Sequence, residues 1–269
     1  KTVDGFGYQW KTYSQDNLVD DEYDGIFESY FRIFPFEKLP KNAVGFDLGC
    51  GSGRWAKGMA PRVGKLYCID PSHDALNVAK NKLANYENTE FLNNGVDNIN
   101  IAKNSMDFGY SLGVLHHIPD TLKGIKNCVD IIKPGGFFLV YLYYSLDNKP
   151  MWYKGIWKLS NFFRSIISIL PNTLKLIITK MIALLIYFPF SKCSLILEKI
   201  GFNVENIPLS SYRDKSFYTM QTDSFDRFAT RLERRFSKKE INEMMIEAGL
   251  SDIEFNEGVP YWVAVGKKL

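Results

Sequence analysis

The chain has 269 residues, 46% of them hydrophobic, and a formal net charge of +3. This length and apolar content suffice for one domain with a large core and an additional segment. The net charge is too small to indicate nucleic-acid binding by itself. The four cysteines form no C-x-x-C pair, and two of the three histidines are adjacent. We therefore expect reduced, buried thiols at Cys50, Cys68 and Cys128, and no metal site.

The first 40 residues are predicted to form a cap segment that precedes the fold proper. An aromatic-rich stretch over 6–13 comes first, and a helical pattern then runs from Asp24 to Phe34 before Pro35. Rings such as Tyr8 and Trp10 can close over a cationic ligand through cation–π contact. Packing of the same rings in a hydrophobic groove is the alternative.

The stretch VGFDLGCGSGRWAKG, residues 44–58, predicts a strand, a glycine loop and a helix. The strand ends in Asp47, and the helix begins at Arg54. Glycines at such a turn supply positive φ and let a ligand approach the backbone. A dinucleotide fingerprint G-x-G-x-x-G/A would need a small residue where Arg54 stands. Asp47, at the mouth of the loop, would repel a pyrophosphate and suits a cationic ligand, although a turn that binds nothing is the alternative.

Two further strands carry candidate ligand contacts. The first, 65–69, ends in Asp70, 21 residues after Gly49, close to the spacing at which an acidic residue meets a ribose in doubly wound folds. Asp70 or Ser72 can also serve as the N-cap of the next helix, and Ser72 is the better cap. The second strand, 89–92, leads into residues 94–97, where backbone and an apolar side chain would meet an adenine.

A fourth strand over 106–112 and a fifth over 136–144 complete the parallel pattern. The fourth is followed by Gly113 and the pair His116 and His117, at the carboxyl edge where ligands bind in such sheets. An ordinary pKa near 6.5 makes either histidine a candidate general base. Packing beneath the ligand is the alternative role. Tyr143 and Tyr144, at the end of the fifth strand, are secondary candidates.

Segment 148–197 carries seven basic residues and no acidic ones. Its apolar positions from Leu174 to Ile186 recur with a helical period. A transmembrane helix needs about 20 apolar residues, and the longest uncharged run, 181–191, is shorter and contains Pro189, so we expect no span. Two interpretations stay open. One is a helical lid on the sheet edge with its lysines facing water, and the other a cationic, aromatic-rimmed surface for a membrane interface or a lipid-linked substrate.

The remainder of the chain is polar and then returns to a regular pattern. Five arginines over 210–235 could hold a phosphate or carboxylate, with nearby acids as alternative partners. These arginines are Arg213, Arg227, Arg231, Arg234 and Arg235, and the acids are Asp223, Asp226 and Glu233. Ser237 and Glu240 predict a capping box that opens a helix over 238–248, closed by Gly249. Strands over 252–255 and 261–266 follow.

Four motifs, in this order, resemble those of the class I S-adenosylmethionine-dependent methyltransferases: DLGCGSG, CIDPS, MDFGYSLGVLHHIPD and KPGGFFLV. The resemblance covers roughly 6–144 and resumes at 236–268. It implies an α/β fold with a doubly wound, mostly parallel, Rossmann-like seven-stranded sheet and a helical insert after the fifth strand. The expected parts are an N-terminal cap (1–40), the cofactor-binding core (41–147), a helical lid or substrate insert (148–235) and a C-terminal completion of the sheet (236–269).

The resemblance also implies site residues for S-adenosylmethionine and for a methyl acceptor, with no metal. The expected cofactor residues are Tyr8, Trp10, Asp47, Gly49, Cys50, Gly51, Gly53, Asp70, Pro71, Gly95, Val96, Leu112 and Gly113. His117 is the first choice as catalytic base because it matches the second histidine of the fourth-strand motif, and His116 and Tyr143 come next. Acceptor contacts are expected from Tyr144, Tyr212, Arg213, Tyr218 and Arg227.

The implied activity is methylation of an oxygen or nitrogen of a small-molecule or glycan-type acceptor. The chain, including its PYWVAVGKK ending, looks like bacterial methyltransferases associated with surface-polysaccharide and sugar-nucleotide biosynthesis. A lipid or quinone methyltransferase at a membrane surface and a non-catalytic S-adenosylmethionine-binding protein are the alternatives. We expect a cytoplasmic protein that does not bind nucleic acid. Peripheral contact with the inner face of the membrane through 148–197 stays open, as does the oligomeric state.

Overall fold

The computed structural model describes residues 2–14 and 19–269 of the chain, with side chains described from residue 5 onward. These residues fall into two compact units. Of the described residues, the helical unit takes 2–9, 19–23 and 146–231, and the sheet unit takes 10–14, 24–145 and 232–269. The boundary divides the first two helices, α1 (Thr2–Thr12) and α2 (Asp20–Phe31). Helix α2 is shifted from the predicted 24–34, because the acidic run at 20–22 already forms its first turn.

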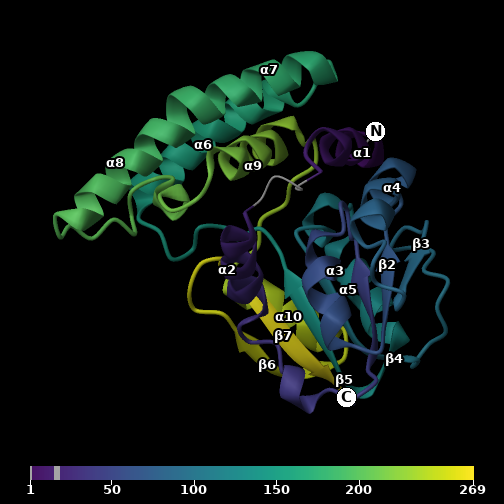
Figure 1. Cartoon of the computed structure of the whole chain (residues 1–269). Helices are drawn as coiled ribbons and strands as arrows, with labels where there is room; N and C mark the ends of the chain where they lie inside the picture. The colour runs from purple at the N-terminus through teal and green to yellow at the C-terminus, as the bar shows by residue number, and fades with distance from the viewer. Residues whose placement is uncertain (1, 15–18) are drawn as a thin grey trace. The chain divides into compact units, whose positions relative to one another are not determined.

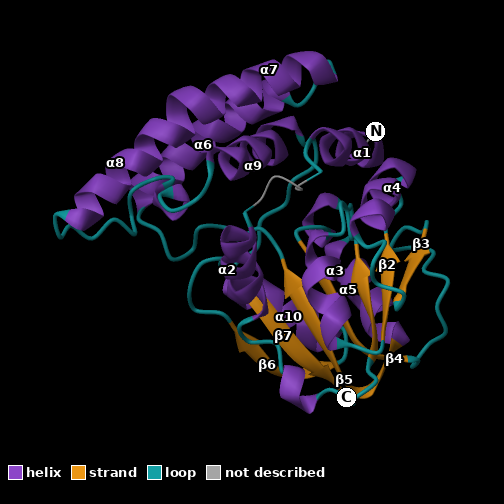
Figure 2. Cartoon of the chain, in the orientation of Figure 1, coloured by secondary structure: helices purple, strands orange, loops and turns teal. Residues whose placement is uncertain are grey.

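The sheet unit is built on seven strands (Figures 1 and 2) in the order β3-β2-β1-β4-β5-β7-β6. Strands β1 to β5 are parallel, and β7 is antiparallel to both β5 and β6. This confirms the predicted doubly wound, mostly parallel sheet, with the helical insert following β5. The strands are β1 (Val44–Leu48), β2 (Lys65–Ile69), β3 (Thr89–Leu92), β4 (Met106–Leu112), β5 (Ile132–Tyr141), β6 (Leu250–Phe255) and β7 (Val263–Lys268).

The last three strands differ from their predicted bounds. Strand β5 ends at Tyr141, which pairs with Val263 of β7, so Tyr143 and Tyr144 lie beyond the strand. The predicted end at 144 was wrong because the pairing with β7 ends at Tyr141. Tyr144 forms only an isolated bridge with Phe236. Strand β7 begins at Val263 and not at residue 261, because the segment containing Pro260 is a turn.

Helices of the sheet unit begin where their capping residues predict. Ser72 accepts a hydrogen bond from the Ala75 amide and caps α4 (His73–Lys82), so Ser72 is the cap and not Asp70. Ser237 and Glu240 form the predicted capping box of α10 (Lys238–Glu247). The other helices are α3 (Arg54–Met59) and α5 (Thr121–Ile131), with single 3-10 turns η1 (Phe36–Lys38), η2 (Ala60–Arg62) and η3 (Leu115–His117).

The helical unit packs three long helical stretches around a small core. They are α6 (Met151–Ile167), then α7 (Asn172–Ile182) running through the π-helical segment η4 (Ala183–Tyr187) into α8 (Phe188–Lys199), and α9 (Phe217–Ala229). A single turn, η5 (Ser210–Tyr212), precedes α9. Helix α9 packs against α6 and α7. The core contains Ile167, Ala183, Tyr187, Met220 and Phe228.

The stretch from α7 to α8 corrects two expectations. Asn172–Lys199 is one helical stretch of 28 residues with a mean hydropathy of 1.7, long and apolar enough to cross a membrane by length and composition alone. The prediction that no segment is long enough was wrong because it counted only charge-free runs. Lys175 is buried within the unit, so the lid interpretation, in which the lysines of this segment face water, was wrong at this position.

Candidate functional site

The glycine loop after β1 has the backbone conformation that its sequence predicts. Gly49, Gly51 and Gly53 all have positive φ, at 75°, 54° and 77°, which other residues adopt at a cost. The Gly49 amide donates to the Ile69 carbonyl at 2.7 Å, so the loop is tied to the end of β2. A Cβ built on Gly51 would lie 2.8 Å from Nε1 of Trp10. The indole of Trp10 therefore lies directly against the loop.

Asp70 directly follows β2 and contacts the glycine loop through its side chain. Its Oδ2 accepts a hydrogen bond from the Gly51 amide at 3.0 Å, and its Oδ1 accepts one from the Ser72 amide at 2.8 Å. Burial raises the pKa of this carboxyl, and the two hydrogen bonds oppose that rise. Since each carboxylate oxygen can accept two hydrogen bonds, Asp70 keeps capacity for the hydroxyls of a ribose. That role stays a prediction.

Asp47 is fully buried near the end of β1 and is not exposed at the mouth of the loop as predicted. The register places it between Cys68 of β2 and Tyr110 of β4, and its exposed fraction is 0%. Burial raises the pKa of the Asp47 carboxyl well above the ordinary value; the Tyr110 hydroxyl lowers it, while the charge of Asp70 raises it. Within the described residues, neither Asp47 oxygen has a hydrogen bond of acceptable geometry.

A buried acid with unmet acceptors is costly unless a donor arrives. The arrangement at Asp47 therefore fits a ligand that carries a cationic hydrogen-bond donor, such as the ammonium of S-adenosylmethionine. It does not fit a pyrophosphate. The buried carboxyl of Asp47 thus fits the cofactor that the sequence motifs imply.

The remaining cofactor candidates line the same edge of the sheet. Gly113 follows β4 with φ at +79°, and a Cβ built there would meet nothing within 4 Å, so a ligand can approach it. Gly95 and Val96 follow β3, where the Gly95 amide donates to Asn98 Oδ1 at 2.7 Å and the Val96 carbonyl accepts from Asn127 at 3.0 Å. The Val96 side chain packs against the core, so contact of these two residues with an adenine stays a prediction. Cys50 and Leu112 are buried, whereas Pro71 is exposed.

The two histidines are buried side by side after β4. The His116 ring stacks on Tyr143 with 3.8 Å between ring centroids and lies 4.0 Å from the His117 ring. Burial, the neighbouring His117 and the Arg235 charge lower the pKa of His116 well below the ordinary value, so His116 is neutral near pH 7. Nδ1 of His117 lies 2.6 Å from the Leu232 carbonyl oxygen. A carbonyl can only accept, so that nitrogen carries the proton, and in the neutral form of the ring Nε2 carries the lone pair.

The predicted acceptor residues mostly have partners of their own. Arg213 forms two hydrogen bonds with the Glu198 carboxylate, at 2.6 and 2.8 Å, and Arg227 lies 5.6 Å from the ring of Trp157. Tyr212 packs against Tyr187 in the helical unit. These contacts suit a structural role, and contact with an acceptor stays a prediction.

Three other candidates lie outside that group. Tyr8 belongs to the helical unit, where its ring centroid lies 6.2 Å from that of Phe225. Tyr218 lies in α9, and Tyr144 of the sheet unit packs against Tyr261. No group of three or more metal-ligating side chains is present within the described residues.

Sequence reasoning missed three residues of the site. Tyr110 lies beside Asp47, the Asn93 amide donates to the Asp70 carbonyl at 3.0 Å, and a Cβ on Gly49 would meet the Val114 side chain at 2.4 Å. Alternation within β4 was the available signal for Tyr110, since it faces the same way as Phe108 and Leu112. The contacts of Asn93 and Val114 depend on tertiary placement, which no local pattern carries.

Part of the chain matches a known protein family, and curated proteins resemble it in sequence. Residues 46–140 match the family model described as Methyltransferase domain. A demethylmenaquinone methyltransferase from Bacillus licheniformis is 28% identical over 102 residues, which cover 36% of this chain and 44% of that protein. Another from Staphylococcus epidermidis is 26% identical over 148 residues, covering 54% and 59%. The chain spans about half the length of the curated relatives it matches.

Solved structures agree on the fold. A proposed methyltransferase from Haloferax volcanii, solved in complex with a methyltransferase activator, has a TM-score of 0.52 at 14% identity and covers 96% of each chain. A proposed methyltransferase from Bacillus halodurans has a TM-score of 0.50 at 15% identity, covering 86% of this chain and 72% of that one. Residues 46–140 of this chain therefore match a methyltransferase domain, and the chain shares the class I fold of these solved structures.

Proposed function

We propose that this protein transfers a methyl group from S-adenosylmethionine to an oxygen or nitrogen of a small-molecule acceptor that is held at a membrane surface. A quinone and a lipid-linked glycan are the two acceptor classes that fit. The quinone is supported by the names of the curated relatives, and the glycan by the family resemblance of the sequence. The observation that carries the proposal is the exposed apolar face of the helical unit.

The cofactor would be held at the carboxyl edge of β1, β2 and β4. In this proposal Asp47 faces its ammonium, Asp70 its ribose, and the open backbone at Gly113 lets it approach closely, while Trp10 lies over the loop. The sulfonium supplies an already activated methyl group. The protein then has to align donor and acceptor within about 3–3.5 Å and exclude water. His117, with Nε2 as acceptor, would take the proton of a hydroxyl or ammonium acceptor.

The long helix from α7 to α8 carries apolar residues on two sides: Ala183 and Tyr187 face the core of the unit, and a second apolar row is exposed. Lys175, Thr179 and Ser191 are buried, whereas Ile177, Met181 and several neighbours at helical spacing are largely exposed. A surface helix of a soluble protein buries its apolar stripe and exposes its polar one. We call the exposed set the α7–α8 stripe: Leu174, Ile177, Met181, Leu184, Leu185 and Phe188.

Helix α6 adds a second exposed apolar row. Ile156, Leu159 and Phe163 lie three and four residues apart and are about half exposed or more, which places them on one face of the helix. Monomeric soluble proteins rarely expose contiguous apolar surface beyond a few hundred Å², and larger patches mark interaction sites. Such rows, accompanied by seven basic and no acidic residues over 148–197, suit a bilayer interface that contains anionic lipids.

The proposal is tested by methyl transfer with acceptors that differ only in their tail. The full chain is incubated with radiolabelled S-adenosylmethionine and a demethylated quinone or a lipid-linked sugar, in vesicles containing phosphatidylglycerol. The same head groups without tails are offered in solution. We expect transfer to one tailed acceptor class and at least tenfold less to its tail-free analogue.

Two variants separate the parts of the proposal. Asp47→Asn should abolish transfer while leaving vesicle binding unchanged, because it changes only the sheet unit. Faster transfer to the tail-free head group than to the tailed acceptor would overturn the membrane part. Cofactor binding without transfer to any acceptor would instead support a non-catalytic protein.

A further inference from the structure

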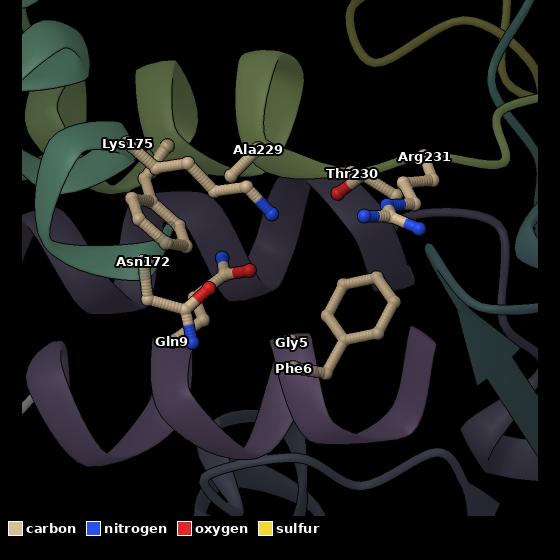
Figure 3. A pocket seen from close by; sticks show the side chains of 9 residues that line it. Gly5, Phe6, Gln9, Asn172, Lys175, Ala229, Thr230 and Arg231 are labelled. Carbon is tan, nitrogen blue, oxygen red and sulfur yellow. The ribbon is translucent and has the colours of Figure 1, made fainter. Parts of the chain in front are cut away.

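A pocket within the helical unit gathers cationic and amide side chains that no part of the proposed transfer reaction uses. It lies between the middle of α1, the first turn of α7 and the end of α9 (Figure 3). Its lining includes Phe6, Gln9, Asn172, Lys175, Thr230 and Arg231. In Figure 3 the ammonium of Lys175 and the guanidinium of Arg231 point into the same space. All of these residues belong to the helical unit.

Lys175 is the unusual member of the pocket. It is only 8% exposed, although lysine is almost never buried without a partner. Within the described residues it forms no ion pair with a carboxylate. Burial lowers the pKa of its ammonium, and the charge of Arg231 lowers it further. A buried cation beside a second cation is unfavourable until an anion joins them.

The cations around Lys175 have only neutral partners in the described structure. Arg164, 9% exposed, donates to the carbonyls of Thr230 and Arg231 at 2.8 and 3.1 Å. Arg231 donates through Nε to the Ser168 carbonyl at 3.3 Å, which leaves its two terminal nitrogens as further donors. The end of α9 is thus surrounded by three positive charges.

We propose that this pocket binds the phosphate group of a ligand. Lys175 and Arg231 would contact its oxygens, and the Gln9 amide, buried at the floor, would donate a further hydrogen bond. A phosphate monoester carries close to two negative charges near pH 7, matching the two cations better than a single carboxylate does. Arginine suits phosphate through its planar fork, and lysine as a point charge. This site is independent of methyl transfer.

Inorganic phosphate and thermal unfolding test the site in the full chain. Phosphate should raise the unfolding midpoint of the wild type more than chloride of equal ionic strength, because it binds only the folded protein. Lys175→Gln should raise the midpoint without phosphate, since it removes a buried charge, and should weaken phosphate binding at least tenfold. Lys180→Gln, an exposed lysine in the same helix, should behave as the wild type does.

A second variant guards against a folding defect of the first. Arg231 is exposed, so Arg231→Gln should fold normally and still lose the phosphate response. The site is refuted if the wild type responds to phosphate no more than to chloride. It is equally refuted if Lys175→Gln and Arg231→Gln both keep the full response.

Soluble and lipid sources of the phosphate are distinguished by two probes. Glycerol 3-phosphate represents a soluble monoester, and vesicles with phosphatidic acid represent a lipid one, compared with phosphatidylglycerol vesicles of equal surface charge. A stabilisation by glycerol 3-phosphate assigns the site to a soluble ligand. A preference for phosphatidic acid that disappears in Lys175→Gln assigns it to a lipid headgroup. Lack of response to both probes would overturn the assignment to a phosphomonoester.

Discussion

The Gly51 amide donates a hydrogen bond to Asp70 Oδ2 at 3.0 Å and thereby joins the glycine loop after β1 to the end of β2. Asp70 consequently has two tasks in the proposed site. It fixes the loop through the Gly51 amide, and with a cofactor bound it would receive ribose hydroxyls through its remaining lone pairs. A change at this position therefore affects both the loop and the cofactor.

Asp70→Ala should weaken binding of S-adenosylmethionine and of its demethylated product alike. A lost charge-assisted hydrogen bond costs about 1.5–3 kcal/mol, which corresponds to about ten- to hundredfold in affinity. Isothermal titration calorimetry measures both ligands. Ser72→Ala removes the neighbouring helix cap but leaves the carboxylate, so it should lower stability and leave affinity nearly unchanged. Unchanged affinity in Asp70→Ala would refute the ribose contact.

Asp47→Asn should have opposite effects on stability and on cofactor binding. The pKa of Asp47 is raised in the folded chain, so the folded state holds a proton that the unfolded state has released. Stability due to this group is present below the ordinary pKa of about 4 and is lost as pH rises towards the raised value. We expect the variant to unfold at a higher temperature than the wild type near neutral pH, with the difference shrinking at pH 4.

Proton release on binding provides an independent measurement at Asp47. A cofactor ammonium beside this carboxyl would lower its pKa again, so binding below the raised pKa should release a proton. Calorimetry in two buffers with different ionisation enthalpies detects the release, and Asp47→Asn should lack it while binding more weakly. Equal proton release in the variant would show that another group titrates.

Local sequence patterns correctly predicted those features of the site that are formed by a single strand and the turn that follows it. The positive φ of Gly51, the cap at Ser72 and the carboxyl-edge position of Asp70 all follow from spacing along the chain. The burial of Asp47 and its closeness to Tyr110 depend on the register of three strands, which spacing does not give. The burial of Lys175 was likewise missed, because helical periodicity identifies two faces and does not decide which one packs inward.

His117→Ala should slow methyl transfer by about 10²–10⁴ while cofactor affinity stays nearly intact, if Nε2 is the general base. His117 also contacts the Leu232 carbonyl through Nδ1, so part of the effect can arise from lost structure. Turnover is therefore expressed per folded molecule, with the folded fraction taken from circular dichroism. His117→Asn keeps a donor for that carbonyl but lacks the base.

The two substitutions at His117 distinguish the roles. A base requires both variants to be slow, and a steeper pH dependence of transfer in the wild type than in either variant. Normal turnover in His117→Asn together with instability of His117→Ala would make His117 a positioning residue. The proton would then leave through another group.

The last prediction concerns the α7–α8 stripe. Replacing Ile177 and Leu184 with serine should reduce binding to phosphatidylglycerol vesicles at least tenfold, because each side chain is about half exposed and would lose its burial in the interface. Fold stability should change little, since neither residue belongs to the core of the unit. Ile246→Ser, at an equally exposed position on α10, is the matched control and should bind as the wild type does.

Salt separates the two contributions to this binding. Each basic residue near an anionic surface contributes about 1 kcal/mol and is screened by added salt, whereas the apolar contribution is not. Wild-type binding should therefore fall steeply between low and high salt, and the serine variant should start lower. Vesicle flotation measures both. If no wild-type protein floats with anionic vesicles at low salt, the stripe does not face a bilayer, and the interpretation of segment 148–197 as a lid alone would stand.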